Sequence, residues 1–165
     1  MPPDNSAATG RLTRTTEAAS STPAALTPSG GLVVLLRQAE YVLTSMMIGD
    51  LDQEQLTPER WRILSVLRDD PGLTMAVLMS RAVLPAASLT RHVDALVAQG
   101  LVIRRPHATD GRRVIAALSP HGLVVCDRVR ARQAEREARL RTALGADRFD
   151  SMVSDLRLIP HVAES

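Results

Sequence analysis

The sequence has few aromatic residues, one cysteine and no lysine. Its only aromatic residues are Tyr41, Trp61 and Phe149, too few to build the stacking platforms with which proteins bind single-stranded nucleic acid. A lone Cys126 excludes an internal disulfide framework and most cysteine-based metal sites, and it fits a reducing compartment. We expect this thiol to be buried and inert, with a redox switch as the alternative.

Long apolar runs and enzyme signatures are also missing. No run approaches the roughly 18 residues of a membrane-spanning helix, and the N-terminus lacks the apolar core of a secretory signal. We therefore expect a soluble cytoplasmic protein without a membrane partner. Nothing resembles a phosphate loop or a nucleophile elbow, and the histidines lack metal-ligand spacing, so we expect no catalytic residue, metal or cofactor. Asp50, Asp52 and Glu54 cluster in what we expect to be a solvated acidic loop.

What is present indicates one helical domain behind a tail. The chain has 165 residues, of which 45% are apolar, and Leu, Val, Ala and Met dominate, which favours helix. Residues 1–31 are rich in Ser, Thr, Ala and Pro and show no apolar period, so we expect a flexible tail. Residues 32–165 form the predicted single domain. All 20 basic residues are Arg and the net charge is only +2, so DNA binding has to be argued from where the arginines cluster.

Apolar periodicity and cap signals predict the order of elements. Thr57-Pro58, Thr74 and Ser119-Pro120 are typical helix starts, whereas Gly49-Asp50, Gly100, Gly145 and Pro160 are expected to end helices. The predicted elements are a helix at 32–47, helices at 58–68, 75–82 and 86–99, strands at 101–105 and 114–118, a helix at 120–144 and a last helix at 147–159.

Two short helices followed by a hairpin are the order of a winged helix-turn-helix, whose second helix enters the major groove. With Leu89, Val93 and Leu96 buried, the outward positions of helix 86–99 carry small side chains around Arg91. Such a face suits close approach to base edges. The alternative is that Arg91 only pairs with Asp94 three residues later. The candidate DNA contacts in this helix are Ala87, Ser88, Thr90 and Arg91.

The hairpin supplies the basic cluster that the helix alone lacks. Arg112 and Arg113 follow its loop, and Arg104 and Arg105 precede it. A loop of this length can carry one or two guanidinium groups into the narrow minor groove. Asp110 is expected to pair with Arg112 and to hold it in position.

These motifs resemble the MarR family. Its second-helix motif is similar to Leu56-Thr57-Pro58-Glu59-Arg60-Trp61-Arg62-Ile63-Leu64, and its recognition-helix motif to Leu89-Thr90-Arg91-His92-Val93-Asp94-Ala95-Leu96. Its wing motif is similar to Gly100-Leu101-Val102 with Asp110-Gly111-Arg112-Arg113. The resemblance implies a triangular homodimer without catalysis, with dimerisation helices in 32–50 and 120–165 and a DNA-binding lobe at 56–118. It also implies Arg91 at the major groove and Arg112 at the minor groove. Val83, Pro85 and His92 depart from the family pattern.

The expected function is that of a ligand-responsive transcriptional repressor. We expect it to bind double-stranded DNA as a homodimer on a pseudo-palindromic operator. The family resemblance motivates a small aromatic or apolar anionic effector near Met46, Met47, Trp61 and Arg62. A winged-helix protein-interaction module without DNA binding is the alternative, because one fold serves several functions. An enzyme is a remote third option.

Overall fold

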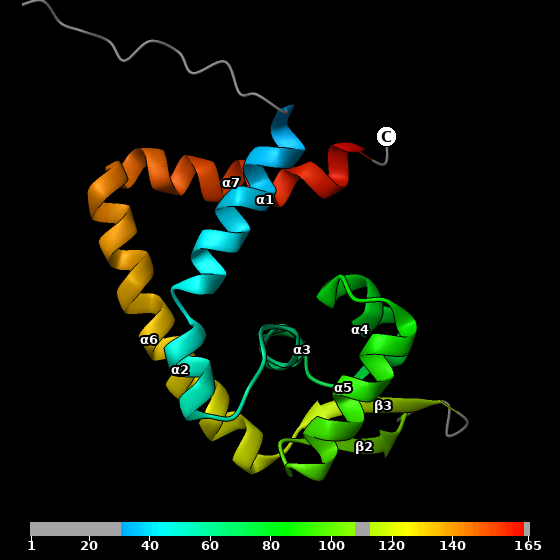
Figure 1. Ribbon diagram of the computed structural model, residues 1–165. Coiled ribbons are helices and arrows are strands. Elements are labelled where there is room, and N and C mark those ends of the chain that lie inside the picture. The colour runs from blue at the N-terminus through cyan, green and yellow to red at the C-terminus, as the bar shows by residue number, and fades with distance from the viewer. Residues whose placement is uncertain (1–30, 108–112, 164–165) are drawn as a thin grey trace, which may run out of the picture. The chain divides into compact units, whose positions relative to one another are not determined.

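The computed structural model describes residues 31–107 and 113–163 (Figure 1). Contacts divide the chain into two units, residues 1–37 and 38–165. The described part of the first unit is the beginning of helix α1 (Gly31–Ser45), whose apolar side chains, including Leu32 and Val33, are exposed. All the other elements belong to the second unit.

The second unit is mainly α-helical with one small antiparallel sheet, as predicted (Figure 1). The sheet has the strand order β1-β3-β2, with Leu73 opposite Ala116 and Val102 opposite Leu118. After α1 the elements are α2 (Ile48–Gln53), α3 (Pro58–Asp69), β1 (Leu73–Thr74), α4 (Met75–Ala82), α5 (Ala86–Ala98), β2 (Val102–Pro106), β3 (Val114–Leu118), α6 (Pro120–Leu144) and α7 (Ala146–Ala163).

Side-chain caps explain why three of these helices begin where they do. The Thr57 hydroxyl accepts a hydrogen bond from the amide of Arg60 at 3.3 Å, and the Thr74 hydroxyl accepts one from Val77 at 3.4 Å. Ser119 does the same for Gly122 at 2.9 Å. Each cap satisfies an amide that the first helical turn leaves without an intrahelical partner. The three predicted helix starts are therefore confirmed.

The structure corrects three sequence predictions. Gly49 and Asp50 do not break a helix; α1 ends at Ser45 and both residues lie in α2. The strand β1 was not predicted, because two residues carry no alternation and are recognisable only from their pairing with β3. Pro160 does not stop the last helix, since α7 continues to Ala163. A proline this close to a helix end removes only one of the last hydrogen bonds.

The hydrophobic core lies where α3, α4, α5, the sheet and the first half of α6 meet. Helix α3 contributes more residues to this core than any other element, and its Ile63, Leu64 and Leu67 are almost completely buried. The core also holds Leu51, Leu56, Trp61, Leu73, Leu78, Ala82, Leu84, Leu89, Val93, Leu96, Leu101, Val102, Ala116, Val125, Cys126 and Val129. The recognition-helix stripe of Leu89, Val93 and Leu96 is buried as predicted.

The junction between the hairpin and α6 is packed backbone against backbone. A Cβ atom placed on Gly122 would lie 2.0 Å from the carbonyl oxygen of Leu101. The buried Ser119 hydroxyl donates to the carbonyl of Gly100 at 2.6 Å and accepts from the amide of Gly122. The amide of Ser119 donates to the carbonyl of Leu101 at 2.9 Å. These contacts tie the end of α5, the start of β2 and the start of α6 to one another.

Gly122→Ala should therefore destabilise the protein strongly, because a methyl group cannot fit unless α6 moves away from Leu101. We expect a loss of about 3 kcal/mol or more in the free energy of unfolding, the upper end of overpacking penalties. Urea denaturation followed by circular dichroism measures it. His121→Ala, on the exposed neighbouring position, is the control and should change stability little. Equal stability of Gly122→Ala and the native chain would contradict the packing at this junction.

Candidate DNA-binding surface

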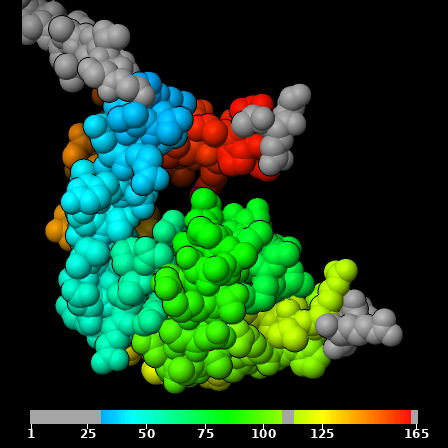
Figure 2. Space-filling view, turned by 45° about the vertical axis from the view of Figure 1, so that its right-hand side comes forward, coloured from blue at the N-terminus to red at the C-terminus, as the bar shows by residue number. Residues whose placement is uncertain are grey.

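Helix α5 presents the face that its sequence predicts. Ala87, Thr90, Arg91, Asp94 and Ala98 are exposed, while the opposite side of the helix lies in the core. Apart from Arg91 and Asp94 these side chains are small, so the helix can approach a groove closely. Figure 2 shows α5 and the hairpin strands together on one face of the second unit.

Ser88 and Thr90 differ in what their hydroxyl groups can still do. Ser88 is half-buried. The Thr90 hydroxyl donates to the carbonyl of Ala86 at 3.2 Å, within its own helix. Its oxygen lone pairs remain for a donor, but its hydrogen is not available to a phosphate unless that bond breaks. Thr90 is therefore better placed to accept than to donate.

Arg91 does not pair with Asp94, which contradicts the alternative reading of this helix. Asp94 instead accepts from Arg104 of β2, at 2.6 Å from Nη2 to Oδ1. Among the described residues, Arg91 makes no hydrogen bond or ion pair. The carboxylate on the exposed side of α5 is thus neutralised from the hairpin, and the Arg91 guanidinium keeps its donors for another partner.

The turn before α5 departs from ideal geometry at Val83 and Pro85, the positions where the sequence departs from the MarR-like pattern. Val83 has φ 52° and ψ 53°, in the left-handed region that a β-branched residue rarely adopts. Pro85 stands at the N-cap of α5 with extended backbone and without a side-chain hydrogen bond to the first turn. The amides at this N-terminus are consequently not capped by a side chain.

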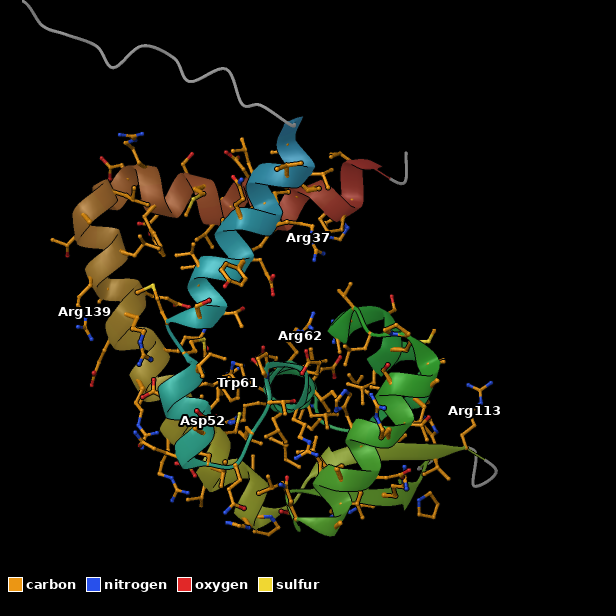
Figure 3. The ribbon with its side chains drawn as sticks, viewed as in Figure 1. Arg37, Asp52, Trp61, Arg62, Arg113 and Arg139 are labelled. Carbon is orange, nitrogen blue, oxygen red and sulfur yellow. The ribbon has the colours of Figure 1, made fainter. Side chains whose placement is uncertain are left out.

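The described part of the hairpin is paired as far as His107 and Arg113. The strands β2 and β3 pair from Val102 and Leu118 outward, and the amide of His107 donates to the carbonyl of Arg113 at 2.8 Å, which closes the base of the loop. Arg105 and Arg113 are exposed, and Figure 3 shows Arg113 at the outer end of β3. Asp110 and Arg112 lie outside the described residues, so their predicted roles and their pairing stay predictions.

The four residues expected near an effector have different environments. Trp61 is buried, and Figure 3 shows it pointing from α3 towards α2. Met47 packs against the core, whereas Met46 is exposed. Arg62 is half-buried and lies 3.9 Å from Glu59, and its Nε is buried without a hydrogen-bond partner among the described residues.

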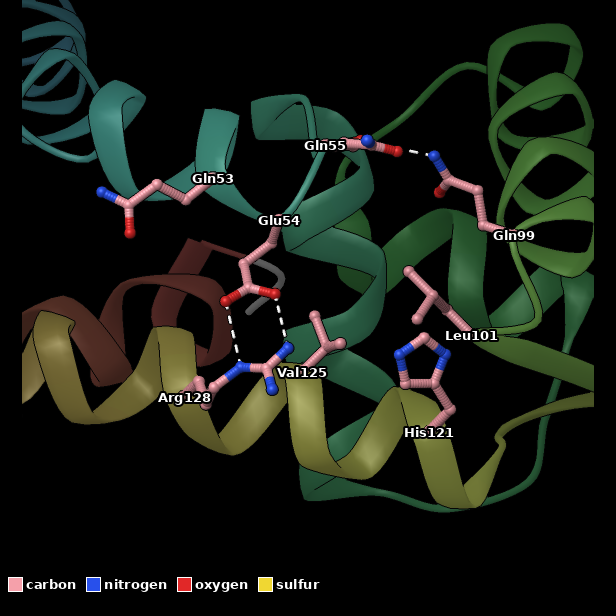
Figure 4. A pocket seen from close by; sticks show the side chains of 8 residues that line it. All are labelled: Gln53, Glu54, Gln55, Gln99, Leu101, His121, Val125 and Arg128. Carbon is pink, nitrogen blue, oxygen red and sulfur yellow. Dashed lines mark hydrogen bonds and ion pairs between the residues drawn. The ribbon is translucent and has the colours of Figure 1, made fainter.

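An open pocket of about 300 Å³ lies elsewhere in the second unit and includes none of those four residues. It lies between the α2–α3 connection, the turn after α5 and the first half of α6 (Figure 4). One wall is the two-pronged ion pair of Glu54 with Arg128, and Gln99 donates to the carbonyl of Gln55 at 3.4 Å. The other lining residues are Gln53, Leu101, His121 and Val125.

The acidic cluster of Asp50, Asp52 and Glu54 lies on α2 and at its end rather than in a loop, and of its three residues only Asp52, within α2, is exposed to solvent. Asp50 lies within α2, and Glu54 caps the end of that helix. Both carboxylates face α6, where Asp50 pairs with Arg136 and Glu54 pairs with Arg128 and Arg132. The sequence signal that was available is the spacing of four, which Asp50 and Glu54 share with Arg128, Arg132 and Arg136 and which places each set on one helix face.

Titratable groups near the surface have perturbed environments. Burial lowers the pKa of His92 below its usual 6.5, against the opposing effect of Glu59, and the nearby Arg91 lowers it further. His92 is therefore neutral at pH 7.

The described residues contain no group of His, Cys, Asp or Glu arranged to hold a metal ion. Within the same ranges, no helix is long and apolar enough to cross a membrane.

Comparison with known proteins identifies the same region. The family model described as "MarR family" matches residues 54–113, from the end of α2 to the wing. An uncharacterised HTH-type transcriptional regulator of Mycobacterium leprae is 36% identical over 98 residues, which are 58% of this chain and 67% of that protein. The chain belongs to the MarR family. Its relatives are transcription regulators, which fits the expectation of a non-enzyme.

Two solved structures resemble this MarR-family chain in fold. The transcriptional repressor CouR, bound to a 23-mer DNA duplex, matches with a TM-score of 0.68 and 27% identity over 78% of this chain and 92% of CouR. NadR in complex with 4-hydroxyphenylacetate matches with a TM-score of 0.72 and 26% identity over 82% of this chain and 95% of NadR. The predicted winged helix-turn-helix fold is therefore confirmed.

Cys126 is buried in α6, as expected of an inert thiol. Its Sγ lies 3.8 Å from the carbonyl oxygen of Leu64, to which the S–H donates. Burial raises the pKa of the Cys126 thiol to about 11. The thiolate that reacts with oxidants is therefore scarce near neutral pH.

We expect Cys126 of the native protein to react with Ellman's reagent at pH 7.5 at least about a hundredfold more slowly than in urea, because labelling has to wait for local opening. Absorbance at 412 nm follows the reaction. Ala98→Cys provides an exposed thiol on α5 as the control and should label rapidly. Rapid labelling of Cys126 in the folded protein would restore the redox switch as an interpretation.

Proposed function

We propose that this chain is a transcriptional repressor that binds double-stranded DNA as a homodimer on a pseudo-palindromic operator and is released by a small aromatic anion. The observation that carries the proposal is the exposed face of α5, where Arg91 stands unpaired among small side chains beside a wing that bears further arginines. A helix with such a face fits the major groove, and the wing fits the adjacent minor groove. CouR supports the proposal as a similar repressor bound to DNA.

Unpartnered apolar surface supports the homodimer. Helix α7 and the end of α1 expose Tyr41, Val42, Leu43, Leu156 and Leu158. Soluble monomers rarely expose large apolar patches, whereas dimer interfaces cover them. The dimerisation helices then belong to 32–50 and 120–165, and two recognition helices about one DNA turn apart read the two half-sites.

Arg91 and Arg112 are proposed to do different work on the operator. Arg91 forks onto a base edge, which specifies sequence, while Arg112 enters the minor groove, which reads width and potential. The other proposed contacts are Ala87, Ser88, Thr90 and Arg113, and Asp110 supports Arg112.

Arg91→Ala should weaken binding to the cognate operator by about 1–3 kcal/mol and relax preference at one base pair in each half-site. Arg112→Ala should also weaken binding, and it should lower the salt dependence and the sensitivity to A·T-rich flanks. Asp110→Ala should act like Arg112→Ala, but more mildly. Fluorescence anisotropy over a salt series, on operator and scrambled duplexes, measures all three effects.

Arg139→Ala is a suitable control, because Arg139 is exposed on the second half of α6, away from α5 and the hairpin. Each variant has to remain a folded dimer. Unchanged DNA binding by both Arg91→Ala and Arg112→Ala would replace this proposal by its alternative, a winged-helix module that binds protein.

The effector is proposed to be an aromatic carboxylate that binds near Met46, Met47, Trp61 and Arg62. Arg62 offers a buried Nε without a partner among the described residues, and the buried indole of Trp61 precedes it on the same helix. A guanidinium group with an unused donor suits a carboxylate, and thioether and indole groups suit an aromatic ring. NadR, a similar protein, is known with 4-hydroxyphenylacetate.

Titration with 4-hydroxyphenylacetate and related phenolic acids should change the fluorescence of Trp61, the only tryptophan, and should weaken operator binding. Arg62→Gln should raise the Kd of the acid about tenfold or more, the effect of losing a charged hydrogen bond. Arg68→Gln, at the far end of α3 in an exposed pair with Asp127, is the control. If neither fluorescence nor DNA affinity changes at millimolar acid, this class of effector is wrong.

A further inference from the structure

Five charged side chains join α2 to α6 in an arrangement that DNA contact does not explain. We name it the α2–α6 brace, and it consists of Asp50, Glu54, Arg128, Arg132 and Arg136. The Glu54 carboxylate accepts two hydrogen bonds from Arg128, at 2.7 Å from Nη2 to Oε2 and at 3.0 Å from Nε to Oε1. Arg132 lies 3.7 Å from the same carboxylate, and Arg136 pairs with Asp50.

The brace lies where α6 leaves the core. Val129 is the last buried residue of α6, and the rest of the helix, from Arg130 to Leu144, continues for about 22 Å at 1.5 Å per residue. Among the described residues, the Arg136–Asp50 pair is the polar contact with α2 or α3 that lies furthest along α6. Leu51 anchors α2 in the core that residues 56–118 also form. Through α2, the brace therefore fixes the outgoing half of α6 to the core of the DNA-binding lobe.

The carboxylates of the brace are sheltered from water, which separates them from the other ion pairs of α6. The Glu54 and Asp50 side chains are 10% and 13% exposed, whereas Asp127, paired with Arg68, is 57% exposed. The arginine partners of Glu54 and Asp50 are 24% to 50% exposed. Fully exposed pairs contribute little, but here the loss of a carboxylate leaves a partly desolvated positive charge without its counter-charge. The hydrogen bond from Arg136 also holds the pKa of Asp50 below its usual 3.8.

The brace contains more positive than negative charge. Three guanidinium groups share two carboxylates, and Nη1 of Arg132 is buried without a hydrogen-bond partner among the described residues. Neutralising either carboxylate therefore adds repulsion between arginines and α2 loses its hold on α6. The expected response is a change in the angle at which α6 leaves the lobe.

That angle matters because α6 leads directly to α7. The two helices pack together, and Arg141 of α6 pairs with Asp150 of α7 at 2.6 Å. In the proposed dimer, α6 and α7 belong to the interface and the lobe carries α5. The orientation of the lobe on α6 then sets the distance between the two recognition helices.

We infer that Asp50 and Glu54 are positioning residues for operator binding: through the brace they fix the separation of the two recognition helices and therefore the half-site spacing that the protein accepts. This inference rests on the proposed function. It concerns residues that touch no base, so it predicts altered spacing selectivity with intact recognition of each half-site.

The first test uses the duplex that the native protein enriches from a randomised 30-base-pair library. From it we derive duplexes with one base pair added or removed between the half-sites, and a duplex with a single half-site. One base pair moves the half-sites by about 3.4 Å along the axis and by about 35° around it. We expect the native protein to lose about tenfold or more in affinity on each altered spacing, a penalty in the range of one mismatched base pair.

The double variant Asp50→Asn with Glu54→Gln should reduce that penalty to about threefold or less, while its affinity for the single half-site stays within about twofold of native. Asp127→Asn is the control for each single substitution: it removes one carboxylate charge from a pair that also joins α6 to α3, but where α6 is held by the core. It should keep the native penalty. A variant in which the charges of one pair are exchanged, Asp50→Arg with Arg136→Asp, rebuilds that pair in the opposite direction. It should keep more of the native spacing penalty than the double variant does.

A second measurement needs no DNA. Spin labels on Ala98→Cys report the distance between the two α5 helices, since the buried Cys126 thiol does not compete for the label. Electron–electron double resonance should show a distance distribution that is shifted or broadened by about 3 Å in the double variant. This is the axial distance that one base pair spans. The distribution should be unchanged in Asp127→Asn. If the double variant is not a folded dimer, Glu54→Gln alone carries both measurements.

Native spacing selectivity or an unchanged distance distribution in the folded variant would overturn the inference and leave the proposed function intact. An equal effect of Asp127→Asn would overturn it too, because any lost pair would then loosen the dimer. If the native protein enriches no sequence with two related half-sites, the proposed function fails first and the inference fails with it.

Discussion

The close approach of the Gly122 backbone to Leu101 is the constraint on which the rest of the second unit depends. Only a residue without a side chain permits it, since a Cβ atom there would overlap the Leu101 carbonyl. Ser119 completes the junction by bonding to both Gly100 and Gly122. Because the end of α5, the start of β2 and the start of α6 meet at this point, α5 and the hairpin keep a fixed orientation on the first turn of α6.

The arginines divide into two groups with different partners. Those of α6 are mostly engaged by carboxylates of α2, α3 and α7, which holds the long helix to its neighbours. On the proposed DNA-binding surface, Arg91 and Arg105 make no hydrogen bond or ion pair among the described residues, and Arg104 forms an ion pair with Asp94. The whole-chain net charge of +2 therefore understates the positive charge of that surface. An arginine paired with a carboxylate attracts a phosphate weakly, whereas an unpaired arginine keeps its full charge.

The recognition helix could be predicted in detail because it depends on local rules. The period of Leu89, Val93 and Leu96 determines which side faces the core, so the exposure of Arg91 followed from the sequence alone. What Arg91 does with Asp94 did not follow, since helix spacing allows that pair and only the neighbouring strand brings Arg104 within 2.6 Å of the same carboxylate. A local rule names possible partners, and the fold selects among them.

Helix starts, the recognition face, the buried thiol and the family could be determined from the sequence by itself, because caps, periodicity and short motifs act over a few residues. Only the tertiary structure decided that Asp50 belongs to a helix, that Leu73 pairs with Ala116, and that the acidic cluster braces α6. In the last two of these cases the deciding contact joins residues more than forty positions apart in the chain. The energy of such a contact depends on burial and on a partner that only the folded chain brings near.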